Sequence, residues 1–178
     1  MPAQMTAETL NALKGWPNMA AVDFHAPFDA TVFQSVTRVP AGSVVSLNSS
    51  GNFILGVGNT KVMPLFTFYA SDDPTVSPPN GGDPSTTRGV YVGLSPTGQC
   101  LALPACGAYE LVSTNFVADS YAPNTLLTSA TSGANAGKLA AGTLWTNTIV
   151  GIVSRGIVDN GYGHDALAFW PHVEFSNP

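Results

Sequence analysis

The sequence predicts a mostly β protein, built either as a single β-barrel or as a β-tulip or sandwich-like domain. Short apolar segments recur along the chain, and clusters of Gly, Pro, Ser or Asn separate them at the spacing of strands and turns. Many of these segments are rich in Val, Ile and Phe, which favour extended backbone. A length of 178 residues fits one such domain with a core that needs no disulfide or metal support.

Residues 1–21 are expected to form an N-terminal arm with a short helix. Leu10 and Leu13 are three residues apart, as on one helix face, and Pro17 would prevent the helix from continuing. Such a short helix is marginal alone in water, so it needs a surface to dock on, either its own domain or another subunit. Trp16 either anchors that contact or fills the end of its own barrel. We expect the protein-contact residues to be Leu10, Leu13, Trp16, Pro17 and Phe24.

Residues 22–178 are expected to form the β domain. Alternation of Phe28, Ala30 and Val32 predicts a strand over residues 28–36. Turn residues predict hairpins with the arms 44–47 and 53–57, 89–94 and 99–103, and, more loosely, 123–130 and 138–139. Further strands are expected over residues 62–69, 109–116, 148–158 and 166–175. Residues 70–89 hold four prolines and three glycines, which predicts a long surface loop.

Charged residues are scarce, which limits the classes of partner. They make up 10% of the chain, against about 25% in an ordinary soluble domain. The polar surface is therefore expected to consist of Ser, Thr and Asn, which a neighbouring protein covers at little cost. The six Lys and Arg residues are scattered, which argues against nucleic-acid binding. No apolar run approaches the roughly 20 residues that span a bilayer, and the first residues lack a signal-peptide pattern, so we expect synthesis in a cytosol and no membrane contact.

No metal or cofactor site is expected. Cys100 and Cys106 lack the CxxC spacing of zinc or redox motifs and are interpreted as structural thiols. His172 and Glu174 would share one face of a strand, but a metal site needs at least three ligands. A metal site that also used His164, Asp165 or His25 is the less favoured alternative.

No catalytic centre is expected either. Residues 151–156 are similar to the GxSxG elbow of serine hydrolases, but Ser154 is one residue too far from Gly151 and no helix pattern follows. Carboxylates such as Asp29 and Glu110 could meet in space for glycoside hydrolysis, yet nothing in their spacing requires it. An enzyme built on a β-barrel is the third and least favoured functional class.

Three segments resemble a known family of virus proteins. They are residues 40–45 (PAGSVV), which enter a hairpin, the strand at residues 151–156, and the closing residues 167–171 (LAFWP). In these features the chain resembles the small capsid decoration, or cement, proteins of tailed bacteriophages. The resemblance implies a virion structural protein, made in the host cytoplasm, that binds the major capsid protein on the outer surface of an assembled capsid and stabilises it. It also implies a homo-oligomer, with a trimer favoured.

The alternative function is a carbohydrate-binding or receptor-binding β-domain, as in a phage head fibre or a lectin-like module. Exposed Tyr or Trp side chains, together with the loop at residues 70–89, could then stack against sugar rings.

Overall fold

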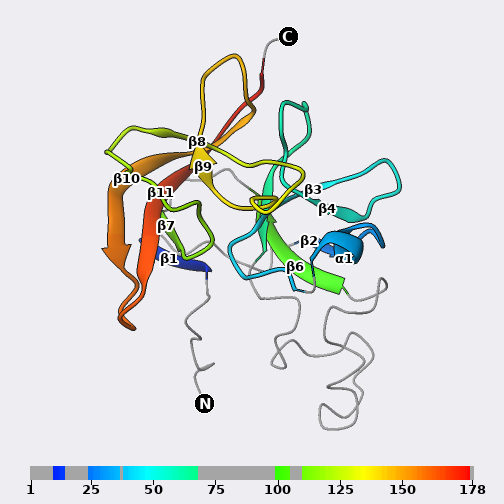
Figure 1. Cartoon of the computed structure of the whole chain (residues 1–178), viewed down its shortest axis with the longest axis horizontal. Helices are drawn as coiled ribbons and strands as arrows, with labels where there is room; N and C mark the ends of the chain where they lie inside the picture. The colour runs from blue at the N-terminus through cyan, green and yellow to red at the C-terminus, as the bar shows by residue number, and fades with distance from the viewer. Residues whose placement is uncertain (1–9, 15–23, 37, 68–98, 105–109, 177–178) are drawn as a thin grey trace, which may run out of the picture.

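A computed structural model describes residues 10–14, 24–36, 38–67, 99–104 and 110–176, in which two antiparallel sheets face each other (Figure 1). The elements are β1 (Leu10–Lys14), β2 (Phe24–Pro27), α1 (Val32–Ser35), β3 (Val44–Leu47), β4 (Phe53–Leu55), β5 (Leu65–Thr67), β6 (Gln99–Pro104), β7 (Glu110–Ser113), β8 (Leu126–Thr128), β9 (Ala140–Ala141), β10 (Ile149–Asp159) and β11 (Asp165–Glu174). Neither sheet closes on itself within these residues. The prediction of a mostly β, sandwich-like domain is therefore confirmed, and the barrel alternative is not the form that the described strands take.

The larger sheet has six strands in the order β1-β7-β11-β10-β8-β9. Its centre is the hairpin of β10 and β11, in which Asp159 is paired with Asp165 at the turn. The Asp159 carboxylate accepts hydrogen bonds from the backbone N–H groups of Gly161 (2.6 Å) and Gly163 (3.2 Å), which closes the turn. The strands predicted over residues 148–158 and 166–175 are thus confirmed.

The smaller sheet has five strands in the order β2-β6-β5-β3-β4. The hairpin of β3 and β4 forms where the turn residues predict it. The Asn48 side chain accepts hydrogen bonds from the backbone N–H groups of Ser50 (2.9 Å) and Asn52 (3.0 Å). Gly51 adopts φ +78°, which an L side chain rarely tolerates. Local turn chemistry therefore sets this register, with Leu47 opposite Phe53.

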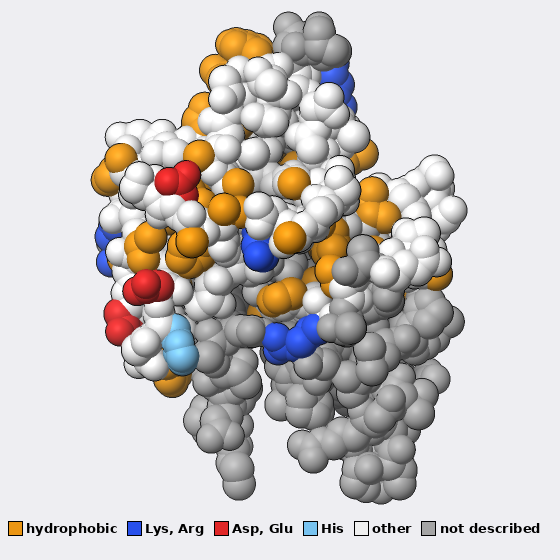
Figure 2. Space-filling model, in the orientation of Figure 1, with side chains coloured by type: hydrophobic (Ala, Val, Ile, Leu, Met, Phe, Trp, Pro, Cys, Tyr) orange, Lys and Arg blue, Asp and Glu red, His pale blue; other side chains and the backbone are white. Residues whose placement is uncertain are grey.

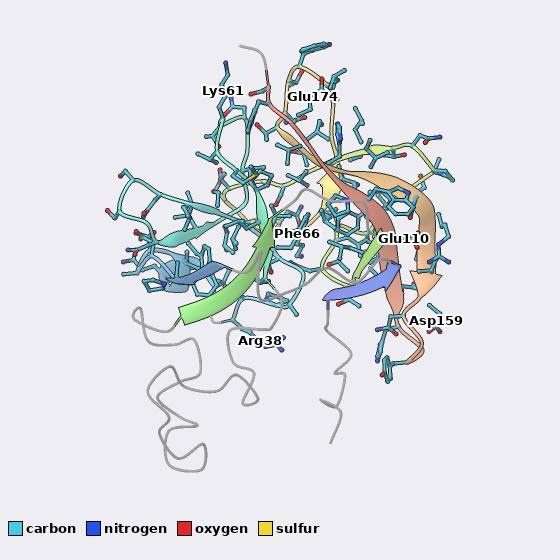
Figure 3. All side chains as sticks on the ribbon, turned by 180° about the vertical axis from the view of Figure 1, so that it is seen from behind. Arg38, Lys61, Phe66, Glu110, Asp159 and Glu174 are labelled. Carbon is cyan, nitrogen blue, oxygen red and sulfur yellow. The ribbon has the colours of Figure 1, made fainter. Side chains whose placement is uncertain are left out.

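The main core lies between the two sheets. Phe66 of β5 and Phe169 of β11 meet across it with ring centroids 5.2 Å apart, and Figure 3 shows Phe66 in the interior. The buried side chains around them come from both sheets and from the connecting segments: Val44, Val57, Leu111, Tyr121, Leu127, Leu139, Val150, Val153 and Leu167. Burial of this apolar surface provides the main driving force for the sheets to associate.

A second core covers the other face of the smaller sheet. Phe28 and Phe53 are in ring contact, with centroids 5.7 Å apart, and Val32 of α1 is buried beside them. The strand predicted over residues 28–36 is therefore wrong. The chain turns at Asp29, whose carboxylate accepts hydrogen bonds from the Thr31 hydroxyl (2.6 Å) and backbone N–H (2.9 Å), and then forms α1.

Backbone hydrogen bonds also join the smaller sheet to the connections of the larger one. Val44 donates to the Gly137 carbonyl (2.8 Å), and Gly58 donates to the Ser129 carbonyl (2.9 Å). Gly56 adopts φ +71° at this junction, and a Cβ there would lie only 1.9 Å from the Ala130 carbonyl oxygen. Only glycine allows so close an approach.

The described part of the N-terminal segment differs from the expected helix. Leu10–Lys14 forms the edge strand β1, which pairs with β7, so the helix prediction is wrong for these residues. A segment too short to be stable as an isolated helix satisfies its backbone groups on the edge of an existing sheet. Residues 1–9 lie outside the described residues, and the division at residue 21 stays a prediction.

The other sequence predictions divide between confirmed strands and undescribed segments. The expected strands at residues 62–69 and 109–116 contain β5 and β7. The first arm of the looser hairpin contains β8, but its partner β9 begins one residue after the predicted second arm at 138–139. The expected loop at residues 70–89 and the hairpin arm at residues 89–94 lie outside the described residues. Strand β6, the other arm of that hairpin, pairs with β2 and β5.

Candidate functional site

The contact residues predicted from the sequence belong to two different sheets. Leu10 and Leu13 are in β1, at the edge of the larger sheet, whereas Phe24 begins β2 of the smaller one. Trp16 and Pro17 lie outside the described residues, so both interpretations of Trp16 stay open.

The serine of the elbow-like sequence lies inside a strand. Ser154 is at a bulge in β10 and donates its hydroxyl hydrogen to the Glu110 carboxylate at 2.5 Å. Arg155 donates to the same carboxylate through Nε (2.9 Å) and Nη2 (3.2 Å), while Glu110 itself is buried. A serine in this position lacks the strand-to-helix turn of a nucleophile elbow, and its hydroxyl already donates to a carboxylate. The arrangement satisfies a buried acid and ties β7 to β10.

The histidine and carboxylate pair predicted on one face of β11 is close but isolated. His172 Nε2 lies 3.8 Å from Glu174 Oε2. His164 is exposed in the turn between β10 and β11. Among the described residues, no group of three or more His, Cys, Asp or Glu side chains could hold a metal ion. Cys100 lies at the start of β6, as expected for a strand residue, and Cys106 lies outside the described residues.

Large apolar side chains on the surface are the most distinctive feature of the described residues. The face shown in Figure 2 carries scattered hydrophobic side chains among many neutral ones and few charged ones. The large apolar side chains with at least 40% of their surface exposed are Met63, Trp145, Ile157, Tyr162, Trp170 and Phe175. Aromatic and Met side chains are enriched in protein interfaces, whose centres are poor in charge.

Three of these side chains belong to one end of the molecule, which we call the loop end and define as residues 58–63, 142–148 and 174–176 (top of Figure 1). Thr148 donates its hydroxyl hydrogen to the Thr60 carbonyl (2.5 Å), and Ser176 donates to the Asn59 carbonyl (2.6 Å). Each segment contributes one exposed apolar side chain, and these are Met63, Trp145 and Phe175. Figure 3 shows the charged residues Lys61 and Glu174 at this same end.

Trp145 is the most exposed of the six, at 59%, and its backbone has φ +70°. The only other described residue outside glycine with positive φ is Asn124, whose side chain suits that conformation. For a bulky residue a positive φ is an outlier that costs about 1–3 kcal/mol. Nothing in the spacing of the sequence marks this residue, because its exposure and its strain both depend on the loop that carries it.

An apolar groove opens beside the loop end. The described residues that line it are Leu47, Val62, Met63 and Leu65, and its volume is about 250 Å³. Val62 and Met63 belong to both the groove and the loop end. This is room for one large side chain.

The remaining exposed side chains lie elsewhere. Ile157 and Tyr162 are at the far end of the β10–β11 hairpin, which projects away from the loop end in Figure 1. Trp170 is on the outer face of the larger sheet, because its neighbour Phe169 points into the core. It pairs with Ile152, which pairs in turn with Leu126, so an apolar row crosses three strands. Trp170 is 40% exposed and therefore does not belong to the core.

Comparisons with protein-family models, with curated proteins and with solved structures find no match for this chain. Within the described ranges, no helix has the length and apolar character needed to cross a membrane.

Proposed function

We propose that this chain is a virion structural protein that binds the outer surface of an assembled phage capsid and stabilises it. The observation that carries the proposal is the set of six large apolar side chains exposed on a two-sheet scaffold whose sequence is only 10% charged. Trp and Tyr, which make up three of the six, are enriched among the residues that contribute most to the affinity of protein interfaces. The resemblance of residues 40–45, 151–156 and 167–171 to decoration proteins supports a capsid as the partner.

The stabilising mechanism is mass action. A protein that binds the assembled capsid but not its separated subunits lowers the free energy of the assembled state, by about 2.7 kcal/mol per site at a free concentration one hundred times the Kd. The partner in this proposal is the major capsid protein, and the decorating unit is a homo-oligomer, with a trimer favoured. Low charge helps because few ionic groups lose water when the surfaces meet.

The role requires no catalysis, and we propose that the chain is not an enzyme. In support, the one serine in an elbow-like sequence donates to Glu110, and that carboxylate is also held by Arg155. The Ser154 hydroxyl and the Glu110 carboxylate are therefore bonded to each other, and Arg155 of β10 holds the carboxylate on the sheet.

The test adds purified protein to capsids assembled without it. We expect the protein to co-sediment with the particles at about micromolar concentration and to raise the temperature at which they release DNA. Bovine serum albumin at equal concentration controls for trapping in the pellet. Recovery of the protein only in the supernatant would refute the proposal.

A second function, carbohydrate or receptor binding, is favoured by a different observation. Trp170 is exposed on the outer face of the larger sheet, and His172 and Glu174 follow it at alternate positions on the same strand face. An aromatic platform beside polar groups is the usual arrangement for stacking on a sugar ring. A glycan array probed with the wild type and with Trp170→Ala tests this function. Signal that disappears in the variant would support it, and an array without signal would count against it.

A further inference from the structure

Trp145 combines two features that folding alone does not explain. Its indole is largely exposed, so it contributes little to the core, and its backbone conformation is unfavourable for any residue with a side chain of this size. Strain of this kind persists where the surrounding structure enforces it, and it is concentrated at functional sites. The position therefore points to a contact that the folded monomer does not make by itself.

The loop that carries Trp145 is held rigid by its own hydrogen bonds. Thr143 donates its backbone N–H to the Asn147 side chain (3.0 Å), while the backbone N–H groups of Thr146 (3.2 Å) and Asn147 (3.0 Å) donate to the Thr143 carbonyl. Thr148 fixes the base of the loop to residues 58–60. A loop ordered in advance loses little conformational freedom when its tip is buried.

Residues 142–148 contain no charged side chain, the Asn147 oxygen accepts from the Thr143 N–H, and the Thr148 hydroxyl donates to the Thr60 carbonyl. Sugar recognition needs polar groups that point at the ligand beside the aromatic ring. Here the Asn147 oxygen and the Thr148 hydroxyl face the protein, which leaves the indole to be buried against apolar surface. The chemistry therefore favours an apolar pocket on a protein over a glycan.

The same chain carries a pocket of that kind. The apolar groove is lined by Leu47, Val62, Met63 and Leu65, has room for one large side chain, and has no charged residue among these four. Trp145 is not one of its lining residues, so the groove of the same copy does not hold the indole. Lys61, next to Val62 in sequence, is exposed and can remain in water at the rim.

We propose that Trp145 of one copy inserts into the apolar groove of a second copy, so that the loop end is a self-association surface. Each copy has a net charge of −5, but Trp145 and the four described residues of the groove carry no charge, so the insertion itself adds no repulsion. Burying an indole in an apolar pocket is typical of the central residues of an interface. This inference concerns the chain alone and does not depend on the capsid proposal.

Sedimentation velocity over a range of concentrations tests the contact, with three variants of the full chain. Trp145→Gly removes the indole and relieves the positive φ, and Met63→Glu places a carboxylate at the groove. Tyr162→Ala removes an exposed aromatic side chain from the hairpin end and is the matched control. We expect wild type and Tyr162→Ala to associate equally, and each of the two loop-end variants to weaken association by at least about tenfold.

Thermal unfolding distinguishes a lost contact from a lost fold. At a concentration where all proteins are monomeric, Trp145→Gly should unfold at the same temperature as the wild type or at a higher one, because the variant is no longer strained. A wild type that stays monomeric over the whole concentration range would overturn the inference, as would variants that associate like the wild type. If the wild type is monomeric but Trp145→Gly abolishes capsid binding, the indole contacts the capsid protein. The capsid proposal then stands and the self-association inference falls.

Discussion

Replacing Gly56 by alanine tests the junction between the two sheets. Gly56 has φ +71°, and its missing side chain would point at the Ala130 carbonyl oxygen, 1.9 Å from the position of a Cβ. Gly51, in the β3–β4 turn, has a similar φ of +78°, but nothing lies within 4 Å of its Cβ position. Gly51→Ala is therefore a matched control, in which the backbone strain is similar and the steric clash is absent.

The two substitutions should differ by the cost of that clash. An alanine in the left-handed region costs about 1–2 kcal/mol, and we expect this loss of unfolding free energy for Gly51→Ala. At Gly56 the clash is with backbone, which no side-chain rotation can relieve. Overpacking costs about 1–3 kcal/mol, and strain on the hydrogen bond from Gly56 to Val44 (2.8 Å) adds about 1 kcal/mol. We therefore expect Gly56→Ala to lose about 3–6 kcal/mol in total.

Urea unfolding followed by far-ultraviolet circular dichroism measures both losses, with equal slopes as the sign that the unfolded states are comparable. Thermal scans on the same proteins provide a second measurement. If Gly56→Ala were within about 0.5 kcal/mol of Gly51→Ala, the close approach of Gly56 to Ala130 would be refuted.

Three further predictions concern single groups. Asp29→Asn should lower the midpoint of urea unfolding at pH 7. The hydrogen bond from the Thr31 hydroxyl lowers the pKa of Asp29 in the folded state. The carboxylate therefore stabilises the fold at any pH above its unfolded pKa of about 3.9. The difference in midpoint between variant and wild type should disappear as the pH falls through the folded pKa of Asp29. A difference that persisted in acid would contradict the lowered pKa of this carboxyl. Phe169→Ala should cost about 3–5 kcal/mol in urea unfolding, since the ring is fully buried between the sheets; a loss below about 1 kcal/mol would argue against that core. Asn147→Ala removes the acceptor for the Thr143 N–H and should lower the free energy of unfolding by about 1 kcal/mol. Hydrogen exchange at the Thr143 amide should become faster. Unchanged exchange would show that this hydrogen bond does not order the loop.

Parts of the fold governed by local chemistry could be predicted from the sequence. The β3–β4 hairpin depends on Asn48 and Gly51, which form the turn whatever the rest of the chain does. The long strand β10 follows from its apolar, β-branched run, β11 follows from the apolar run at residues 166–171, and the turn at Asp159 joins them. The choice between a sandwich and a barrel was not predictable, because it depends on which distant strands pair.

Two segments show how tertiary structure overrides a local pattern. Phe28 and Val32 are four residues apart, a spacing that fits one face of a strand and nearly one face of a helix, and both are buried in the second core. The deciding signal was Asp29 with Thr31, whose hydrogen bonds turn the chain and leave Ala30 exposed.

The N-terminal segment shows the opposite case, in which a helical spacing gives way to a strand. Leu10 and Leu13 have that spacing, yet the segment forms β1 because the edge of β7 offers hydrogen-bond partners. No pattern in residues 10–14 alone reveals that edge.

The candidate site was the least predictable part. The sequence indicated a contact surface through its low charge, but it directed attention to Trp16 and neighbouring residues. The described structure adds Trp145 and the apolar groove that Met63 lines. The exposure of Trp145 and the position of the groove arise from the packing of three separate segments. A single Trp between Leu144 and Thr146 carries no local sign of positive φ.

The most direct test of the functional account is the amount of this protein in purified virus particles. Quantitative mass spectrometry with isotope-labelled peptides gives the ratio of this chain to the major capsid protein. A decoration protein on a symmetric shell should be present in a fixed ratio, on the order of hundreds of copies per particle. Absence from washed particles, or a variable trace amount, would contradict the proposal that this chain binds and stabilises a capsid.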